Sequence, residues 1–145
     1  MSRQIFVNLP VADLAAARAF YEAIGFTNNP MFTDETAACM VLTDVIHVML
    51  LTHEKFAQFT PKAIADAKTT SEVLICISAD SRQAVDEITD KALAAGGREA
   101  REPQDYGFMY GRSFEDLDGH IWEPMWMDMD AATAAMAPQS ETQAA

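Results

Sequence analysis

Residues 114–123 (FEDLDGHIWE) form an acidic turn that leads into an apolar run, and residues 44–50 (DVIHVML) echo this pattern earlier in the chain. The segments before them also correspond. A strand-like run, an Asp and an amphipathic pattern that ends at glycine occur at residues 5–25 and again at residues 73–96. The recurrence of one pattern in both halves of a chain predicts two copies of a single supersecondary unit.

Hydrophobic periodicity predicts the same order of elements in both units. We expect a strand, a helix and three strands at residues 5–9, 13–24, 26–34, 38–43 and 46–52. After a link that is helical around residues 63–67, the order repeats at residues 73–77, 81–96, 98–102, 108–115 and 120–127. Neither unit could bury its sheet alone, so the two must share one sheet or exchange with a second chain. The fold class is therefore α+β, with paired βαβββ modules.

The same patterns indicate one domain at residues 1–130. Module one covers about residues 3–52, the link residues 53–70, and module two about residues 71–128. Residues 131–145 are rich in Ala, Thr, Gln and Ser, and we expect them to form a flexible C-terminal tail.

Composition limits the classes of partner and the compartment. The 145 residues are 50% hydrophobic, and 10 basic side chains stand against 22 acidic ones, a net charge of −12. Such an acidic surface repels phosphate backbones, so we expect no nucleic-acid partner. We also expect no membrane span or signal peptide, and therefore a cytoplasmic protein. Cys39 and Cys76 lie in apolar stretches and are expected to be buried free thiols.

Two stretches carry a family signature: residues 11–26, which contain VADL, FY and GF, and residues 116–123, which spell D-x-D-G-x-x-x-E. Together with the repeated module, they resemble the glyoxalase, bleomycin-resistance and extradiol-dioxygenase superfamily, the vicinal oxygen chelate (VOC) proteins. The resemblance implies that the strands curl into an open half-barrel around a cavity. It also implies a divalent metal held by residues from the first and last strand of each module.

By this resemblance, the family's metal positions correspond here to Phe6, Leu50, Leu74 and Glu123. Only Glu123 has a side chain that binds metal ions, and one carboxylate does not hold a divalent ion. We therefore expect no metal cofactor. The alternative is a degenerate divalent site around Glu123, completed after a register shift of two residues by Asn8, Thr52 or Glu72.

The candidate ligand-binding residues are Phe6, Asn8, Leu50, Leu74, Tyr110, Arg112 and Ser113. Asn8 either faces the ligand or is tied to the backbone. Tyr110 and Arg112 share one face of their strand and Ser113 lies on the other, so either face can be the inward one. Glu123 is either a cavity carboxylate, acting as catalytic base or cation anchor, or the ion-pair partner of Arg112 or Arg101.

These residues predict a glyoxalase/bleomycin-resistance-like protein without a metal, which binds a small cationic or aromatic ligand in its cavity and forms a homodimer. Two enzyme hypotheses remain beside this one. The first is a metal-dependent lyase, isomerase or dioxygenase of the glyoxalase type with a degenerate site. The second is metal-free acid–base chemistry, in which Glu123 is the base and Tyr110 or Arg112 stabilises an enolate-like charge. The fold does not decide between them, because it hosts unrelated chemistries.

Overall fold

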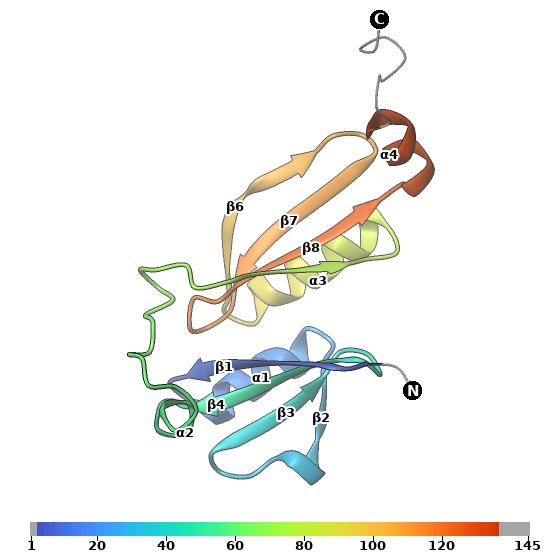
Figure 1. Cartoon of the computed structure of the whole chain (residues 1–145). Coiled ribbons are helices and arrows are strands. Elements are labelled where there is room, and N and C mark those ends of the chain that lie inside the picture. The colour runs from blue at the N-terminus through green and yellow to red at the C-terminus, as the bar shows by residue number, and fades with distance from the viewer. Residues whose placement is uncertain (1–2, 137–145) are drawn as a thin grey trace, which may run out of the picture.

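The computed structural model describes residues 3–136 and contains two four-stranded sheets, one from each module. The strand orders are β1-β4-β3-β2 and β5-β8-β7-β6. In each sheet the first and last strands of the module pair in parallel, and the other pairs are antiparallel. The βαβββ repeat and the open, unclosed arrangement are therefore confirmed (Figure 1). The expectation that the two modules share one sheet is wrong: each forms its own sheet, and the two share a core instead.

Module one consists of β1 (Ile5–Val11), α1 (Leu14–Ala23), β2 (Thr27–Asn29), the 3-10 turn η1 (Pro30–Phe32), β3 (Ala37–Val41) and β4 (Ile46–Thr52). The short helix α2 (His53–Ala57) begins the link. Module two consists of β5 (Leu74–Ser78), α3 (Arg82–Ala94), β6 (Arg98–Asp105), β7 (Met109–Glu115) and β8 (Ile121–Met127), and α4 (Met129–Met136) follows it.

Two helical segments differ from the sequence predictions, and the strand expected at residues 26–34 is confined to Thr27–Asn29, with the 3-10 turn after it. The helix of the link lies at residues 53–57 instead of around 63–67, because the Thr52 hydroxyl accepts the N–H of Lys55 and caps the helix there. Residues 131–136, expected in the flexible tail, belong to α4, which is held by the burial of Ala132 and by the Asp128 carboxylate that accepts the N–H of Ala131. The rest of the expected tail lies outside the described residues.

The two long helices begin in the same way and join one core. Asp13 accepts the N–H of Ala16 at the start of α1, and Ser81 accepts the N–H of Ala84 at the start of α3. Both helices lie on the same side of their sheets (Figure 1). The core between them draws on both modules and includes Ala17, Phe20, Tyr21, Ala92, Phe114 and Trp122. Within residues 3–136, none of the helices is long and apolar enough to span a membrane.

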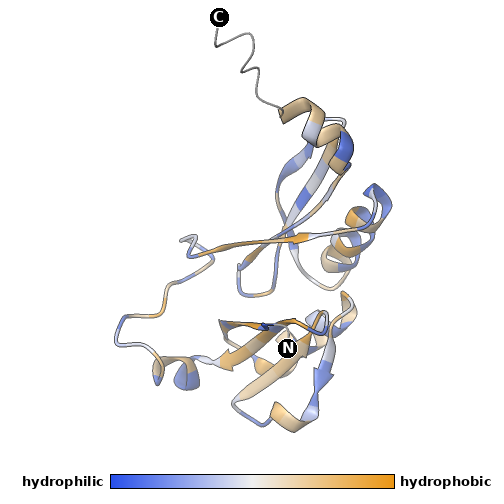
Figure 2. Ribbon diagram, turned by 45° about the vertical axis from the view of Figure 1, so that its right-hand side comes forward, coloured by the Kyte–Doolittle hydropathy of each residue, from blue (hydrophilic) through white to orange (hydrophobic). Residues whose placement is uncertain are grey.

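The opposite side of both sheets is not covered by helices, and we call it the open face. Side chains alternate along a strand, so the neighbours of core residues such as Val7, Ile75 and Trp122 point to the open face. These neighbours are Phe6, Asn8, Met49, Leu74, Cys76, Glu123 and Met125. Figure 2 shows that β5 is largely apolar although it is an edge strand, and Phe6 and Leu74 are 47% and 57% exposed.

Candidate functional site

Glu123 lies on the open face of an inner strand of the second sheet. Its register partner across β5 is Cys76. Its Oε2 atom lies 3.6 Å from Nη2 of Arg101 on β6, so the ion-pair partner is Arg101 and not Arg112. The Arg101 side chain is 59% exposed and that of Glu123 is 24% exposed. Water screens such a pair, and the carboxylate stays accessible from the open face.

A hollow of about 120 Å³ adjoins Glu123, and its lining includes Cys76, Gln104, Met109 and Met125. Cys76 is a free, exposed thiol, which corrects the prediction that both cysteines are buried; Cys39 is buried as expected. The reason is that β5 is an edge strand with an uncovered face. Desolvation by the surrounding atoms raises the pKa of the Cys76 thiol, and the negative charge of Glu123 adds to the rise.

On module one, the open face carries an aromatic stack. The rings of Phe6 and His47 lie 4.4 Å apart between centroids, at an interplanar angle of 13°. Asn8 is exposed on the same face, and its register partner is Met49. The equivalent pair in module two is Cys76 and Glu123.

Leu50 does not belong to the open face. Its side chain is fully buried in the core, so the prediction that it contacts a ligand is corrected. The register shows that Met49 is the counterpart of Glu123 in module one. Since β4 is apolar on both faces, alternation in the sequence does not reveal which of its residues face the helix.

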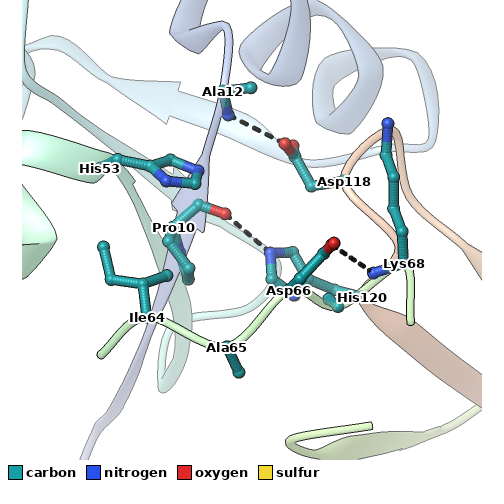
Figure 3. Close-up of a pocket in the computed structure, with 10 residues that line it drawn as sticks. Pro10, Ala12, His53, Ile64, Ala65, Asp66, Lys68, Asp118 and His120 are labelled. Atoms are coloured by element: carbon teal, nitrogen blue, oxygen red, sulfur yellow. Dashed lines mark hydrogen bonds between the residues drawn. The ribbon is translucent and has the colours of Figure 1, made fainter. Parts of the chain in front are cut away.

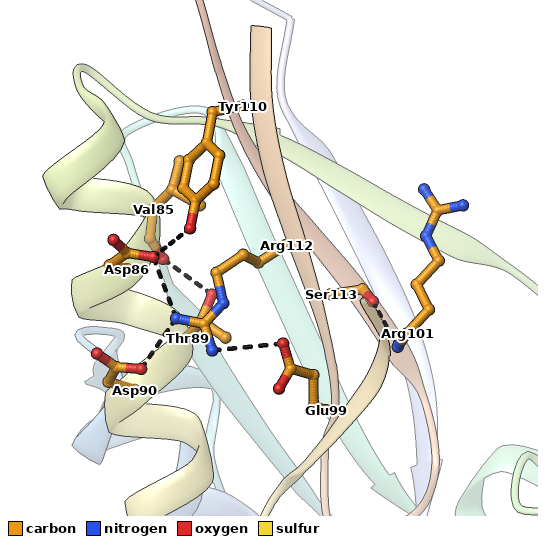
Figure 4. Close-up of polar contacts among 9 residues, drawn as sticks. All are labelled: Val85, Asp86, Thr89, Asp90, Glu99, Arg101, Tyr110, Arg112 and Ser113. Carbon is orange, nitrogen blue, oxygen red and sulfur yellow. Dashed lines mark hydrogen bonds and ion pairs between the residues drawn. The ribbon is translucent and has the colours of Figure 1, made fainter. Parts of the chain in front are cut away.

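Tyr110 and Arg112 point toward α3 (Figure 4). Glu123 follows the core residue Trp122 and therefore lies on the opposite side of the sheet. The Tyr110 hydroxyl donates to Asp86 at 2.7 Å. The Arg112 guanidinium donates to Asp86 at 3.1 Å, to Asp90 at 2.9 Å and to Glu99 at 3.5 Å. These side chains attach α3 to the sheet, so their expected role on the cavity face is corrected.

Ser113 lies on the other face of β7 and is buried. Its hydroxyl accepts the backbone N–H of Arg101 at 3.1 Å, at a point where the pairing of β6 and β7 shifts register (Figure 4). This bond fixes the bulge from which the Arg101 side chain reaches Glu123. Ser113 therefore positions a residue of the site through the backbone.

The D-x-D-G motif makes a buried polar network instead of a reactive site. Asp116 accepts hydrogen bonds from the Tyr21 hydroxyl at 2.5 Å and from the N–H groups of Asp118 and His120. Trp122 Nε1 donates to the Tyr21 oxygen at 2.9 Å. Burial raises the pKa of Asp116, while His120 and the Tyr21 hydrogen bond oppose the rise. The network joins α1 of module one to the β7–β8 turn of module two.

His120 and Asp118 extend this join to β1 and the link (Figure 3). Asp118 accepts the N–H of Ala12 at 2.8 Å. His120 lies 2.8 Å from the Pro10 carbonyl oxygen through Nε2 and 2.8 Å from Glu72 through Nδ1. A ring that donates at both nitrogens is the imidazolium. Burial lowers the pKa of His120, but Asp116, the Pro10 carbonyl and Glu72 outweigh it and raise the pKa above its usual value.

The open face does not fit the divalent metal that the resemblance implies. Glu123 is the one carboxylate among the family's metal positions, and two of the three residues of the alternative register are used elsewhere: Thr52 caps α2 and Glu72 pairs with His120. The third, Asn8, is an exposed amide without a carboxylate beside it. Among residues 3–136, no three His, Cys, Asp or Glu side chains gather so that they could hold a metal ion. We derive no step through a divalent metal.

Comparisons with known proteins agree with this architecture. Residues 3–42 match the family of bleomycin resistance protein-like N-terminal domains. The hypothetical protein SA1046 from S. aureus is 28% identical, with a TM-score of 0.72 over 87% of this chain and 95% of that chain. A glyoxalase/bleomycin resistance protein/dioxygenase family enzyme from Burkholderia phytofirmans PsJN is 20% identical, with a TM-score of 0.71 over 87% of this chain and 99% of that chain. A glyoxalase-related enzyme from Fulvimarina pelagi is 18% identical, with a TM-score of 0.71 over 87% and 88% of the two chains.

No curated protein matches the chain significantly in sequence. The structural likeness nonetheless covers both modules. The sequence match covers β1, α1, β2 and β3 of module one. The fold is that of the glyoxalase/bleomycin resistance/dioxygenase proteins, and residues 3–42 match the bleomycin resistance protein-like N-terminal family; both findings agree with the resemblance drawn from the repeat and the D-x-D-G-x-x-x-E motif.

Proposed function

We propose that the chain binds a small organic cation with an aromatic or apolar body on its open face, without a divalent metal. The observation that carries the proposal is the position of Glu123, an accessible carboxylate beside a hollow on an otherwise mostly apolar surface. Exposed side chains such as Phe6 and Leu74 offer apolar area to the body of a ligand. The carboxylate offers a charge-assisted contact to its cationic group.

The arrangement gives less support to acid–base catalysis. That hypothesis needs Tyr110 or Arg112 beside a substrate on Glu123, but both side chains are bonded to acidic residues of α3 on the other side of the sheet. Arg101 is the positive group next to Glu123, at 3.6 Å from its Oε2 atom. Ligand binding is therefore the function that the geometry favours.

Fluorescence titration with two aromatic dyes tests this proposal. We expect cationic thioflavin T to bind saturably at one site per chain, and Glu123→Gln to weaken binding about tenfold, the loss of one charge-assisted contact. Glu87→Gln, on the exposed side of α3, removes the same charge elsewhere and should leave the affinity unchanged. Binding of the anionic dye anilinonaphthalene sulfonate should not weaken in Glu123→Gln. Failure of thioflavin T to bind, or equal binding by both Glu variants, would refute the proposal.

We also propose that two copies of the chain associate, as expected for a homodimer. Apolar side chains are exposed at the edges of both sheets: Ile5 of β1 is 54% exposed, and Val73, next to β5, is 38% exposed. Burial of these groups against a second copy would be favourable. Light scattering should give twice the mass of the chain, and Ile5→Glu should shift the protein toward the mass of a single chain. A monomeric wild-type protein would contradict this proposal.

A further inference from the structure

The hollow beside Glu123 brings together three sulfur-containing side chains from three strands. Cys76 comes from β5, Met109 from β7 and Met125 from β8, and all three line the same hollow. The thiol is free and exposed, and both methionines are only partly buried. These sulfur atoms play no part in the join between the modules, whose core and polar network lie on the other side of the sheet.

The register of the strands explains why the three side chains can converge. Met125 follows Glu123 by two positions on the open face, and its partner on β7 is Gly111, which has no side chain to fill the space. Cys76 is opposite Glu123 on the parallel strand β5 and therefore diagonal to Met125, one strand away and two residues along. Methionine has three rotatable bonds, so its thioether can cover such a distance. Gly111 thus leaves a notch into which the sulfur atoms can turn.

The chemistry of this cluster differs from that of the metal site that the fold family implies. Hard divalent ions take carboxylate oxygen, which only Glu123 supplies here. Thiolate and thioether ligands instead select soft ions of low charge. From this disagreement we propose that the hollow binds a soft monovalent metal ion, Cu(I) or Ag(I), through the sulfur atoms of Cys76, Met109 and Met125.

Binding is a proton exchange without a redox step. Partial desolvation and the charge of Glu123 raise the pKa of the thiol. The metal ion replaces the thiol proton, which passes to the buffer, and a sulfur–metal bond forms. The product is a neutral thiolate–metal unit beside the Glu123–Arg101 pair. This proposal does not rest on the binding of an organic ligand, since it uses the sulfur atoms and not the Glu123 carboxylate.

Calorimetric titration of the full chain with Ag(I), in buffer free of chloride and thiols, tests the proposal. We expect one tightly bound ion per chain, with release of one proton. Cys76→Ser should weaken binding about a hundredfold, and Met109→Leu and Met125→Leu about tenfold each, because each substitution removes one ligand. Two controls should bind as the wild type does: Cys39→Ser, which removes the buried thiol, and Met31→Leu, a methionine that is 80% exposed elsewhere.

Two results would overturn the inference. Unchanged affinity in both methionine variants would show that Cys76 acts as a lone surface thiol. Equal loss in Cys39→Ser and Cys76→Ser would show that the hollow has no special role. The two proposals also fail separately: thioflavin T binding depends on Glu123, whereas Ag(I) binding depends on Cys76 and the methionines. A Cys76→Ser variant that still binds the dye confirms that the protein is folded.

Discussion

At the scale of single residues, Arg112 is a largely buried cation of module two that is surrounded by acidic side chains. Its side chain is only 12% exposed, and it faces three carboxylates, those of Asp86, Asp90 and Glu99. Removal of the guanidinium leaves these acids close together without a counter-charge. We expect Arg112→Met to lower the free energy of unfolding by about 2 kcal/mol, below the value for a fully buried pair because the partners are partly exposed.

Urea unfolding measures this loss, and Arg18→Met is the matched control. Arg18 forms an exposed pair with Glu22 on α1, 3.5 Å apart, so its removal should cost less than about 0.5 kcal/mol. If the two substitutions lower the free energy of unfolding equally, the Arg112 cluster stabilises the protein no more than an ordinary surface ion pair does.

At the scale of elements, the β7–β8 turn holds the link through Gly119. This residue has a φ of +95°, and a Cβ atom placed on it would lie 2.7 Å from the Ala67 carbonyl oxygen and 2.8 Å from the Lys68 nitrogen. Gly119→Ala must therefore displace the link as well as strain the turn. We expect it to lower the free energy of unfolding by about 2–3 kcal/mol and to speed tryptic cleavage at Lys62 and Lys68.

Gly107→Ala separates the two effects. Gly107 also has a positive φ, +80°, but a Cβ atom there meets nothing within 4 Å. Its substitution should cost about 1 kcal/mol, from backbone strain alone, and leave cleavage of the link unchanged. If both glycine variants lose the same stability and the link is cleaved at the wild-type rate in both, the contact with the link has no energetic weight.

At the scale of the whole molecule, His120 makes the join between the modules sensitive to pH. Its pKa is raised in the folded protein, so its contribution to stability is complete below about pH 6.5, the unfolded value, and is lost as the pH rises through the folded value. We expect the free energy of unfolding, measured by urea titration, to fall as the pH rises above about 6.5. His120→Gln should abolish this fall.

His47→Gln is the control for this pH dependence. His47 is also largely buried, and its Nδ1 donates to the Ile5 carbonyl oxygen at 3.3 Å, but it stacks on Phe6 and has no carboxylate partner in the ion pairs of residues 3–136. This variant should keep the wild-type slope. If the slope survives in His120→Gln and vanishes in His47→Gln, the pH dependence comes from His47 in module one, and the prediction is wrong.

The residues alone predicted the parts of the fold that depend on local pattern. Caps such as Asp13 and Ser81, the alternation of apolar residues and the repeated D-x-D-G turn are properties of neighbouring positions, so they indicated both modules and the family resemblance. Whether Glu123 pairs with Arg101 or with Arg112 stayed open in the sequence, and the structure shows Arg101. The link and the start of α4 were missed because their helices depend on single caps and on the burial of Ala132.

What the sequence by itself determined is thus the order of the elements within each module, the family resemblance and the place of Glu123 on the last strand of module two. Only the tertiary structure decided which way Tyr110 and Arg112 point, that Met49 and not Leu50 is the counterpart of Glu123, and that Cys76 reaches the open face. The physical reason is that strand alternation has a period of two and looks the same from both faces. The packing of α1 and α3 on one side of the sheets chooses between those faces.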